Sequence, residues 1–176
     1  MTSTHKTILA IVGMPGSGKT EAVEYLHKKG IPFIRFGQFT DEGIAKMGLP
    51  LTPDNERIYR EKIRRERGMA AYAIMAKSKI EEELKRNNLI VIDGLYSWEE
   101  YTFLKEHFPH LTLIHVYAEP SIRYKRLAER SIRQIPLAKG RERDIAELEG
   151  VNKGGPIAIA DYVIENNGTR RQLQEK

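Results

Sequence analysis

Apolar positions along the chain gather into short continuous runs separated by longer, mixed segments. Five runs stand out: Thr7–Val12, Ile31–Phe36, Leu89–Asp93, Leu111–Ala118 and Tyr162–Glu165. Strands that helices cover on both faces show continuous apolar runs, whereas half-exposed strands alternate apolar and polar residues. The runs therefore predict the strands of a mainly parallel sheet that lies between two helical layers.

The mixed segments predict helices. From about Asp54 to Arg86, apolar residues recur at three- and four-residue spacing and form one buried stripe, and Gly68 is expected to divide this segment into two helices. Further helices are predicted at Ser17–Lys29, Ser97–Phe108, Pro120–Ile132 and Gly155–Ala160, with a short one after Gly168. Leu137–Gly155 has the least ordered pattern, because it is rich in glycine, arginine and acidic residues. Alternating strands and helices predict a three-layer α/β/α fold in which ligands bind beyond the carboxyl ends of the strands.

Length and composition narrow the class of protein. A chain of 176 residues is most simply one domain, residues 1–176, with its own hydrophobic core. It contains no cysteine, which excludes disulfides and thiolate chemistry and suits a reducing compartment. The N-terminal apolar run is shorter than a signal-peptide core or a membrane span. We expect a soluble cytoplasmic protein with no membrane partner, either a monomer or a homodimer.

The net charge of +5 suits anionic partners. Basic residues cluster at Arg57–Arg67 and again at Arg123–Arg143. Most of these side chains are interpreted as solvated helix faces. Nucleic-acid binding through them ranks low, because no aromatic stacking platform or nucleic-acid motif accompanies the clusters.

The segment Gly13–Thr20, GMPGSGKT, matches the phosphate-binding pattern G-x-x-x-x-G-K-[ST] without a mismatch. A predicted strand precedes it and a predicted helix follows it, which is the context that a P-loop requires. Lys19 is placed to bridge the β- and γ-phosphates of ATP, and the Thr20 hydroxyl is suited to Mg²⁺. The residues predicted to bind the phosphates are Gly13, Pro15, Gly16, Ser17, Gly18, Lys19 and Thr20.

Two further features indicate phosphoryl transfer. Asp93 ends a predicted strand beside the P-loop, where a carboxylate orients magnesium or faces the acceptor, although it could also be a capping group. Arg126 and Arg130 share a helix face with Arg123, and one or two of them could reach the transferred phosphate. We assign Lys19, Asp93, Arg126 and Arg130 to catalysis, with Thr20 and Asp93 as magnesium ligands.

Several motifs follow one another in an order that resembles a known class of enzyme. They are GMPGSGKT, IRRERG at Ile63–Gly68, VIDGLYSWEEY at Val91–Tyr101, AEPSIRYKRL at Ala118–Leu127 and ADYVIENNGT at Ala160–Thr169. Together they span nearly the whole chain, and they resemble nucleoside-monophosphate kinases of the adenylate kinase type and dephospho-coenzyme-A kinases. The chain is most similar to an archaeal and bacterial adenylate-kinase-related group. The resemblance implies a P-loop NTPase fold with a five-stranded parallel sheet of order 2-3-1-4-5, an acceptor-binding helical region at about 38–86 and a lid at about 127–150.

The resemblance also implies roles for individual residues. Arg64 would bind the acceptor phosphate, with Arg65 as a substitute, and Asn166 and Gly168 would lie near the adenine of the donor. Asp41 falls roughly where adenylate kinases carry a second acceptor arginine, which weakens the case for adenosine monophosphate. Dephospho-coenzyme-A kinases place an acidic residue directly after strand two, where this chain has Gln38 and then Asp41. Asp41 or Asp93 could therefore act as the base.

Two hypotheses follow for the function. In the first, the protein is a kinase that transfers the γ-phosphate of Mg·ATP to a small nucleotide-like acceptor. In the second, it is a nucleotide-dependent regulatory module with slow ATPase activity. Trp98 and Tyr101 are expected to pack, or to stack on the acceptor. Glu142 and Asp144 are expected to form surface ion pairs with lid arginines, which contribute little.

Overall fold

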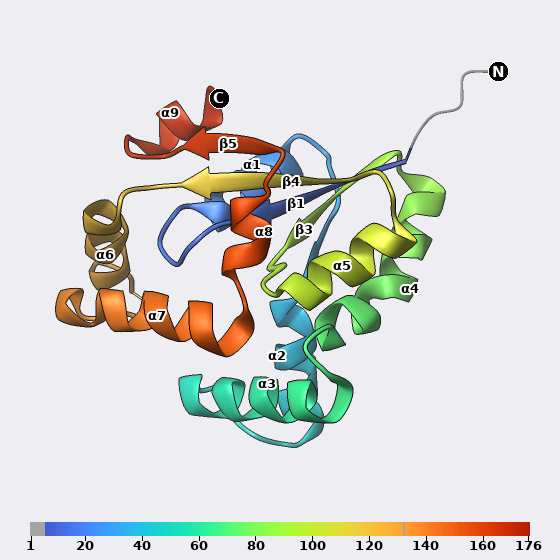
Figure 1. The fold of residues 1–176 in the computed structure, drawn as a ribbon, viewed down its shortest axis with the longest axis horizontal. Helices are drawn as coiled ribbons and strands as arrows, with labels where there is room; N and C mark the ends of the chain where they lie inside the picture. The colour runs from blue at the N-terminus through green and yellow to red at the C-terminus, as the bar shows by residue number, and fades with distance from the viewer. Residues whose placement is uncertain (1–5, 132) are drawn as a thin grey trace.

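The computed structural model describes residues 6–131 and 133–176, and its centre is a five-stranded, fully parallel sheet. The strands are β1 (Thr7–Val12), β2 (Phe33–Arg35), β3 (Leu89–Asp93), β4 (Leu111–Tyr117) and β5 (Tyr162–Glu165). Their order is β2-β3-β1-β4-β5 (Figure 1). This order confirms the predicted P-loop NTPase fold, and each strand lies within its predicted apolar run.

The sheet brings the predicted site residues to one edge. In the register of β1, Ile11 pairs with Asp93 of β3, and Val12 pairs with His115 of β4. Parallel strands end at the same edge, so Asp93 emerges next to the P-loop that follows Val12.

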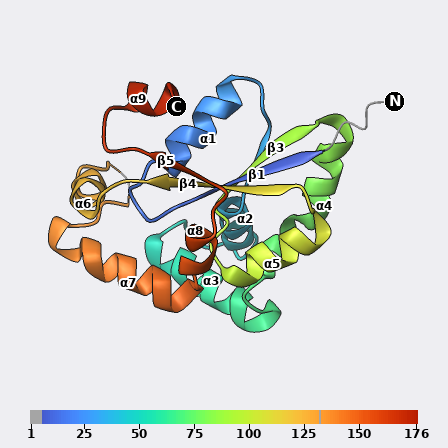
Figure 2. The same ribbon diagram turned by 45° about the horizontal axis from the view of Figure 1, so that its top comes forward.

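Helices cover both faces of the sheet (Figure 2). They are α1 (Lys19–Lys28), α2 (Gly37–Lys46), α3 (Pro53–Arg67), α4 (Ala71–Arg86), α5 (Trp98–His107), α6 (Pro120–Ala128), α7 (Gly140–Val151), α8 (Gly154–Ala158) and α9 (Arg170–Gln174), with a 3-10 turn at Leu137–Lys139. One apolar cluster joins the sheet to α1 and α9 through Ile11, Val23, Val91, Val116 and Leu173. A larger cluster on the other face includes Ala10, Ile34, Ile80, Ile92 and Leu104 and joins the sheet to α4 and α5. Among the described residues, none of these helices has the length and apolar character needed to cross a membrane.

The structure corrects the sequence interpretation in the second half of the chain. Leu137–Gly155 was expected to be irregular, but it contains the 12-residue helix α7. Buried ion pairs hold α7, as described below, so its sequence lacks a clear apolar stripe. The helix predicted at Pro120–Ile132 ends at Ala128, and residue 132 lies outside the described residues. Gly68, with φ of +80°, separates α3 from α4 as predicted.

Candidate nucleotide-binding and phosphotransfer site

The P-loop curves because several of its glycines have positive φ angles, which side-chain-bearing residues rarely adopt. Gly16 has φ of +80°, and a Cβ atom there would lie 2.6 Å from the carbonyl oxygen of Arg123. Gly18 has φ of +102° and precedes α1, whose first turn has no side-chain cap. The first N–H groups of α1 are therefore available to an anion, and the helix dipole favours negative charge at this end.

Lys19 and Asp93 lie together at the mouth of this loop. Lys19 is half-buried, and its Nζ donates a hydrogen bond of 3.0 Å to the carbonyl oxygen of Met14. Burial, followed by the charge of Lys153, lowers the pKa of Lys19 to about 7. Asp93 is 8% exposed, and burial raises the pKa of its carboxyl against the opposing effect of Lys19. The pair therefore places a cation and a carboxylate in a site with little water.

The oxygen groups at the P-loop fit a magnesium ion better than a metal held entirely by protein. The hydroxyl of Thr20 and the carboxylate of Asp93 both line the cleft. Mg²⁺ retains several waters and binds few protein oxygens, usually together with substrate phosphates. Within the described residues, no group of three histidine, cysteine or acidic side chains could hold a metal ion. Thr20 and Asp93 would thus hold the ion together with phosphate oxygens.

The P-loop opens into a cleft of about 610 Å³. The walls come from the P-loop, the start of α2, α3 and the segment from α6 to α8 (Figure 1). Nine basic and five acidic side chains line it, so the cleft carries excess positive charge. Such a site suits a substrate with several phosphate groups.

Arg64 lies in the wall opposite the P-loop and has little counter-charge. Its side chain is 10% exposed, and its guanidinium lies 5.3 Å from the centre of the Tyr72 ring. The nearest carboxylate oxygen belongs to Glu100, at 3.9 Å. Burial raises the pKa of Glu100 to about 7, so this carboxyl is protonated in part at neutral pH. Arg65, on the next position of α3, is exposed and does not line the cleft.

Asp41 lines the cleft but already has a partner. Its carboxylate accepts a hydrogen bond from Arg35 on the neighbouring strand β2. Gln38 lies outside the cleft lining and donates to Glu42 at 2.6 Å. Of the two residues suggested as a base, Asp93 therefore lies closer to Lys19 in charge coupling, whereas Asp41 is engaged with Arg35.

The structure separates Arg126 from Arg130. Arg126 donates to the carbonyl oxygens of Asn166 and Gly168, both at 2.9 Å, and it does not line the cleft. Asn166 in turn donates to the carbonyl of Ser17 at 2.7 Å. Arg130, one helical turn farther on, lines the cleft. Arg126 thus links α6 to the loop after β5, and its catalytic role stays a prediction.

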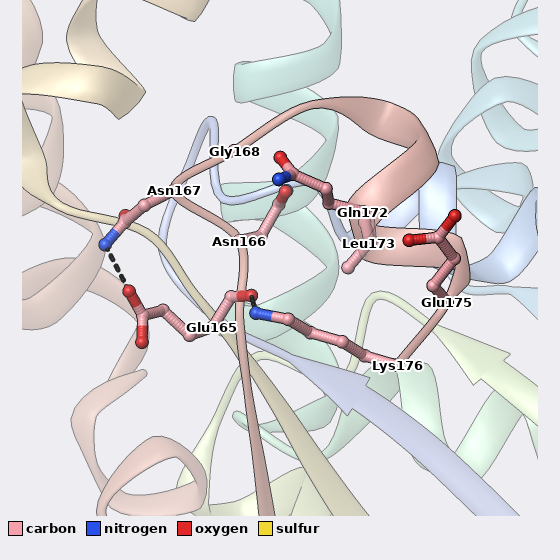
Figure 3. A pocket seen from close by; sticks show the side chains of 8 residues that line it. All are labelled: Glu165, Asn166, Asn167, Gly168, Gln172, Leu173, Glu175 and Lys176. Atoms are coloured by element: carbon pink, nitrogen blue, oxygen red, sulfur yellow. Dashed lines mark hydrogen bonds between the residues drawn. The ribbon is translucent and has the colours of Figure 1, made fainter.

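A second hollow, of about 280 Å³, lies between the loop that follows β5 and helix α9 (Figure 3). Its lining includes Asn166, Gly168 and Leu173. The Oδ1 atom of Asn166 is buried without a hydrogen-bond partner among the described residues. An apolar side chain next to an unpaired amide oxygen is a suitable surface for a nucleotide base, in the place where the sequence predicts the adenine.

Asp144 is the clearest correction among the charged residues. It was expected to form a surface ion pair, but it is 8% exposed and binds both terminal nitrogens of Arg123, at 2.8 and 2.6 Å. The same guanidinium donates to the carbonyl of Pro15, at 3.1 Å, and to that of Ala118. Arg123 therefore fixes α7 to the P-loop instead of contacting the cleft.

Sequence reasoning missed a buried cation in the cleft wall. Lys153 is 2% exposed, and its Nζ lies 2.5 Å from an oxygen of Glu147 and 4.6 Å from the centre of the Tyr96 ring. Glu56 was also missed: it is 6% exposed and accepts hydrogen bonds from Arg60 of α3 and from Arg133, beyond α6. No motif marks these residues, because their partners are distant in the sequence.

Comparisons with known proteins place the chain in a family. A family described as an AAA domain matches residues 9–147. A UPF0200 protein of Thermococcus kodakarensis is 36% identical over 172 residues, which cover 95% of this chain and 92% of the relative. A UPF0200 protein of Methanocaldococcus jannaschii is 36% identical over 162 residues, covering 90% and 81%. The chain belongs to the UPF0200 family. Its P-loop, the cleft and most of α7 therefore lie within an AAA domain that continues into family-wide sequence similarity.

Solved structures extend the comparison of this UPF0200 chain to small-molecule kinases. TT1252 from Thermus thermophilus superposes with a TM-score of 0.63 at 18% identity, over 97% of this chain and 93% of that one. Shikimate kinase from Bacteroides thetaiotaomicron gives 0.58 at 16% identity, over 96% and 92%. A gluconokinase from Sinorhizobium meliloti gives 0.56 at 16% identity, over 97% and 88%. At these identities the likeness establishes the fold, and it leaves the substrate open.

Proposed function

We propose that this protein is a kinase that transfers the γ-phosphate of Mg·ATP to a nucleotide-like small molecule, within one domain spanning residues 1–176. One observation carries the proposal: the P-loop lysine Lys19 opens onto a basic cleft whose opposite wall presents the buried, weakly paired Arg64. A nucleotide switch needs only the first half of this site. A kinase needs both halves, one for the donor and one for the acceptor.

The donor half would consist of the P-loop, Asn166 and Gly168. The loop amides and Lys19 would bind the phosphates, and the hollow beside Gly168 would receive the adenine. Mg²⁺, bound through Thr20 and Asp93, would neutralise charge on the phosphate oxygens. This arrangement is supported by the uncapped start of α1 and the unpaired amide oxygen of Asn166.

The chemical step is an in-line displacement at phosphorus. An acceptor oxygen forms a bond to the γ-phosphorus while the bond to the bridging oxygen breaks, and its electron pair leaves with ADP. If the acceptor is a hydroxyl group, its proton passes to the carboxylate of Asp93, whose pKa is raised by burial. If the acceptor is a phosphate, no proton needs to move. Arg130 would stabilise the charge on the moving group.

The acceptor half would lie in the region of about 38–86, with the lid at about 127–150 closing over it. Arg64 would bind an acceptor phosphate, as in the resemblance to nucleoside-monophosphate and dephospho-coenzyme-A kinases. Asp41, tied to Arg35, would face the rest of the acceptor. Lid closure would exclude water, so transfer to the acceptor would outpace hydrolysis. The lack of cysteine suits a reducing cytoplasm, where we place the reaction.

A coupled assay for ADP release tests this proposal. The panel contains nucleoside monophosphates, nucleosides and dephospho-coenzyme A, each with Mg·ATP. We expect one acceptor to raise the rate of ADP release at least about tenfold above the rate without acceptor, as water exclusion requires. If no acceptor raises the rate above that of water hydrolysis, the kinase assignment is wrong.

One observation favours the alternative of a nucleotide-dependent regulatory module. Arginines of the acceptor half are partly neutralised within the chain: Arg35 by Asp41, and Arg60 and Arg133 by Glu56. A module of this kind would bind nucleotide tightly, hydrolyse it slowly without any acceptor, and retain a protein partner in only one nucleotide state.

A further inference from the structure

Lys153 is a buried cation for which the donor and acceptor halves described above have no use. It lies between α7 and α8 and is 2% exposed, yet it lines the same cleft as Lys19. A lysine this deeply buried normally has a carboxylate partner, and Lys153 has Glu147 at 2.5 Å. The face of the Tyr96 ring, 4.6 Å from Nζ, provides its second contact.

The charges around Lys153 do not balance locally. Glu147 is shared, because its other oxygen accepts a hydrogen bond from Arg143. Burial alone would raise the pKa of Glu147, but Lys153 and Arg143 hold it down at about 2. One carboxylate thus serves two cations, and Arg130 adds a further positive charge to the same wall.

Lys153 also acts on the P-loop lysine. After burial, its charge is the largest influence that lowers the pKa of Lys19. Two ammonium groups that repel across a poorly hydrated cleft destabilise each other until an anion lies between them. The anion that such a gap suits is compact and multiply charged, with oxygens on opposite sides. A terminal phosphoryl group has this form.

We propose that Lys153 is a second phosphate-binding lysine, whose ammonium contacts the terminal phosphoryl group of the bound nucleotide from the side opposite Lys19. Glu147 and the Tyr96 ring hold the lysine at the cleft wall before the nucleotide binds. The proposal rests on the proposed function only as far as the P-loop binds a nucleoside triphosphate. It adds a contact that distinguishes a triphosphate from a diphosphate.

The competing interpretation is a structural ion pair that only anchors α7 to α8. A double variant separates the two. Lys153→Met/Glu147→Gln removes both charges, so neither group is left buried without a partner, and a purely structural pair can then be lost at little cost. A contact with phosphate cannot be restored in this way. The single variant Lys153→Met leaves Glu147 with Arg143 as its partner.

The experiment measures equilibrium binding of Mg²⁺ complexes of ADP and of the β,γ-imido analogue of ATP by titration calorimetry. Both Lys153→Met and the double variant are expected to bind the analogue about tenfold or more weakly, since charged hydrogen bonds are among the strong ones. ADP affinity should change by about twofold or less, because ADP lacks the terminal group. Urea unfolding confirms that the double variant folds. The matched control is Lys139→Met/Glu142→Gln, an exposed pair at the start of α7, which should leave both affinities unchanged.

Two results would overturn the proposal: wild-type discrimination between analogue and ADP in the double variant, or equal weakening of both ligands. Its failure can be told apart from that of the kinase assignment. If the wild type transfers phosphate but Lys153→Met changes neither the discrimination nor kcat, Lys153 has no such role and the kinase stands. If the discrimination falls although no acceptor is ever phosphorylated, the lysine proposal stands and the kinase fails. If the wild type binds neither ligand, both are wrong.

Discussion

The buried ion pair between Arg123 and Asp144 should be among the most sensitive points of the fold. Asp144→Ala leaves the guanidinium of Arg123 without its carboxylate, and the two side chains are only 6% and 12% exposed. Removing one partner of a buried pair typically lowers the free energy of unfolding by about 3–5 kcal/mol. The hydroxyl of Tyr124, which donates to Asp144 at 2.9 Å, loses its acceptor and adds about 1 kcal/mol.

The loss is large compared with the whole stability of a domain, which is about 5–15 kcal/mol. For a chain of this size it corresponds to a fall in melting temperature on the order of 10 °C. Urea unfolding, followed by circular dichroism, gives the free energy directly. The control is Glu142→Ala on the same helix, whose partner Lys139 is exposed, and it should lower stability by less than about 1 kcal/mol. If Asp144→Ala loses no more than this control, α7 does not depend on the pair and our account of the helix is wrong.

Three further predictions concern the cleft. Because the pKa of Lys19 is lowered to about 7, the free protein has lost this proton at pH 8.5; Mg·ATP binding should then take up a proton, measured by calorimetry in buffers of different ionisation enthalpy, and affinity should fall as pH rises above about 7. Arg64→Met should raise the KM for a phosphate-bearing acceptor at least about tenfold and leave the KM for ATP within about twofold, measured by steady-state kinetics. Gly155→Ala should lower the free energy of unfolding by about 1–3 kcal/mol in urea titrations, because its Cβ would lie 2.6 Å from the Trp98 ring.

Each of the three has a contrary result. Proton uptake that persists unchanged in Lys19→Met would mean that another group titrates. The exposed neighbour Arg65 supplies the control for Arg64, and equal effects of Arg65→Met and Arg64→Met would remove the acceptor role. Gly154→Ala meets a side chain only at 3.5 Å and should be nearly neutral, so equal losses at Gly154 and Gly155 would contradict the packing argument.

The sheet and the P-loop could be predicted because their signals are local. Buried parallel strands need continuous apolar runs such as LIVID at Leu89–Asp93, and the phosphate cradle needs glycines at fixed spacing. The parallel arrangement then brings Asp93 beside Lys19 with no further information. The tertiary resemblance supplied the strand order.

The lid side of the cleft could not be predicted, because its stability comes from contacts between distant residues. Helix α7 has no apolar stripe, and its exposed Ile145 and Leu148 give a misleading pattern. Arg126 and Arg130 share a helix face in sequence, but carbonyl groups 40 residues away bind the first of them and leave the second in the cleft. Lys153 belongs to no motif, and only the fold shows that it is buried beside Lys19.

Single-turnover reaction with γ-labelled ATP, excess protein and the acceptor that most stimulates ADP release tests the central claim most directly. We predict that the label moves from ATP to the acceptor, with little released as inorganic phosphate, and that Lys19→Met, which lacks the P-loop cation, abolishes the transfer. Label that appears only as inorganic phosphate, whatever the acceptor, would contradict the account and would identify the protein as a nucleotide hydrolase.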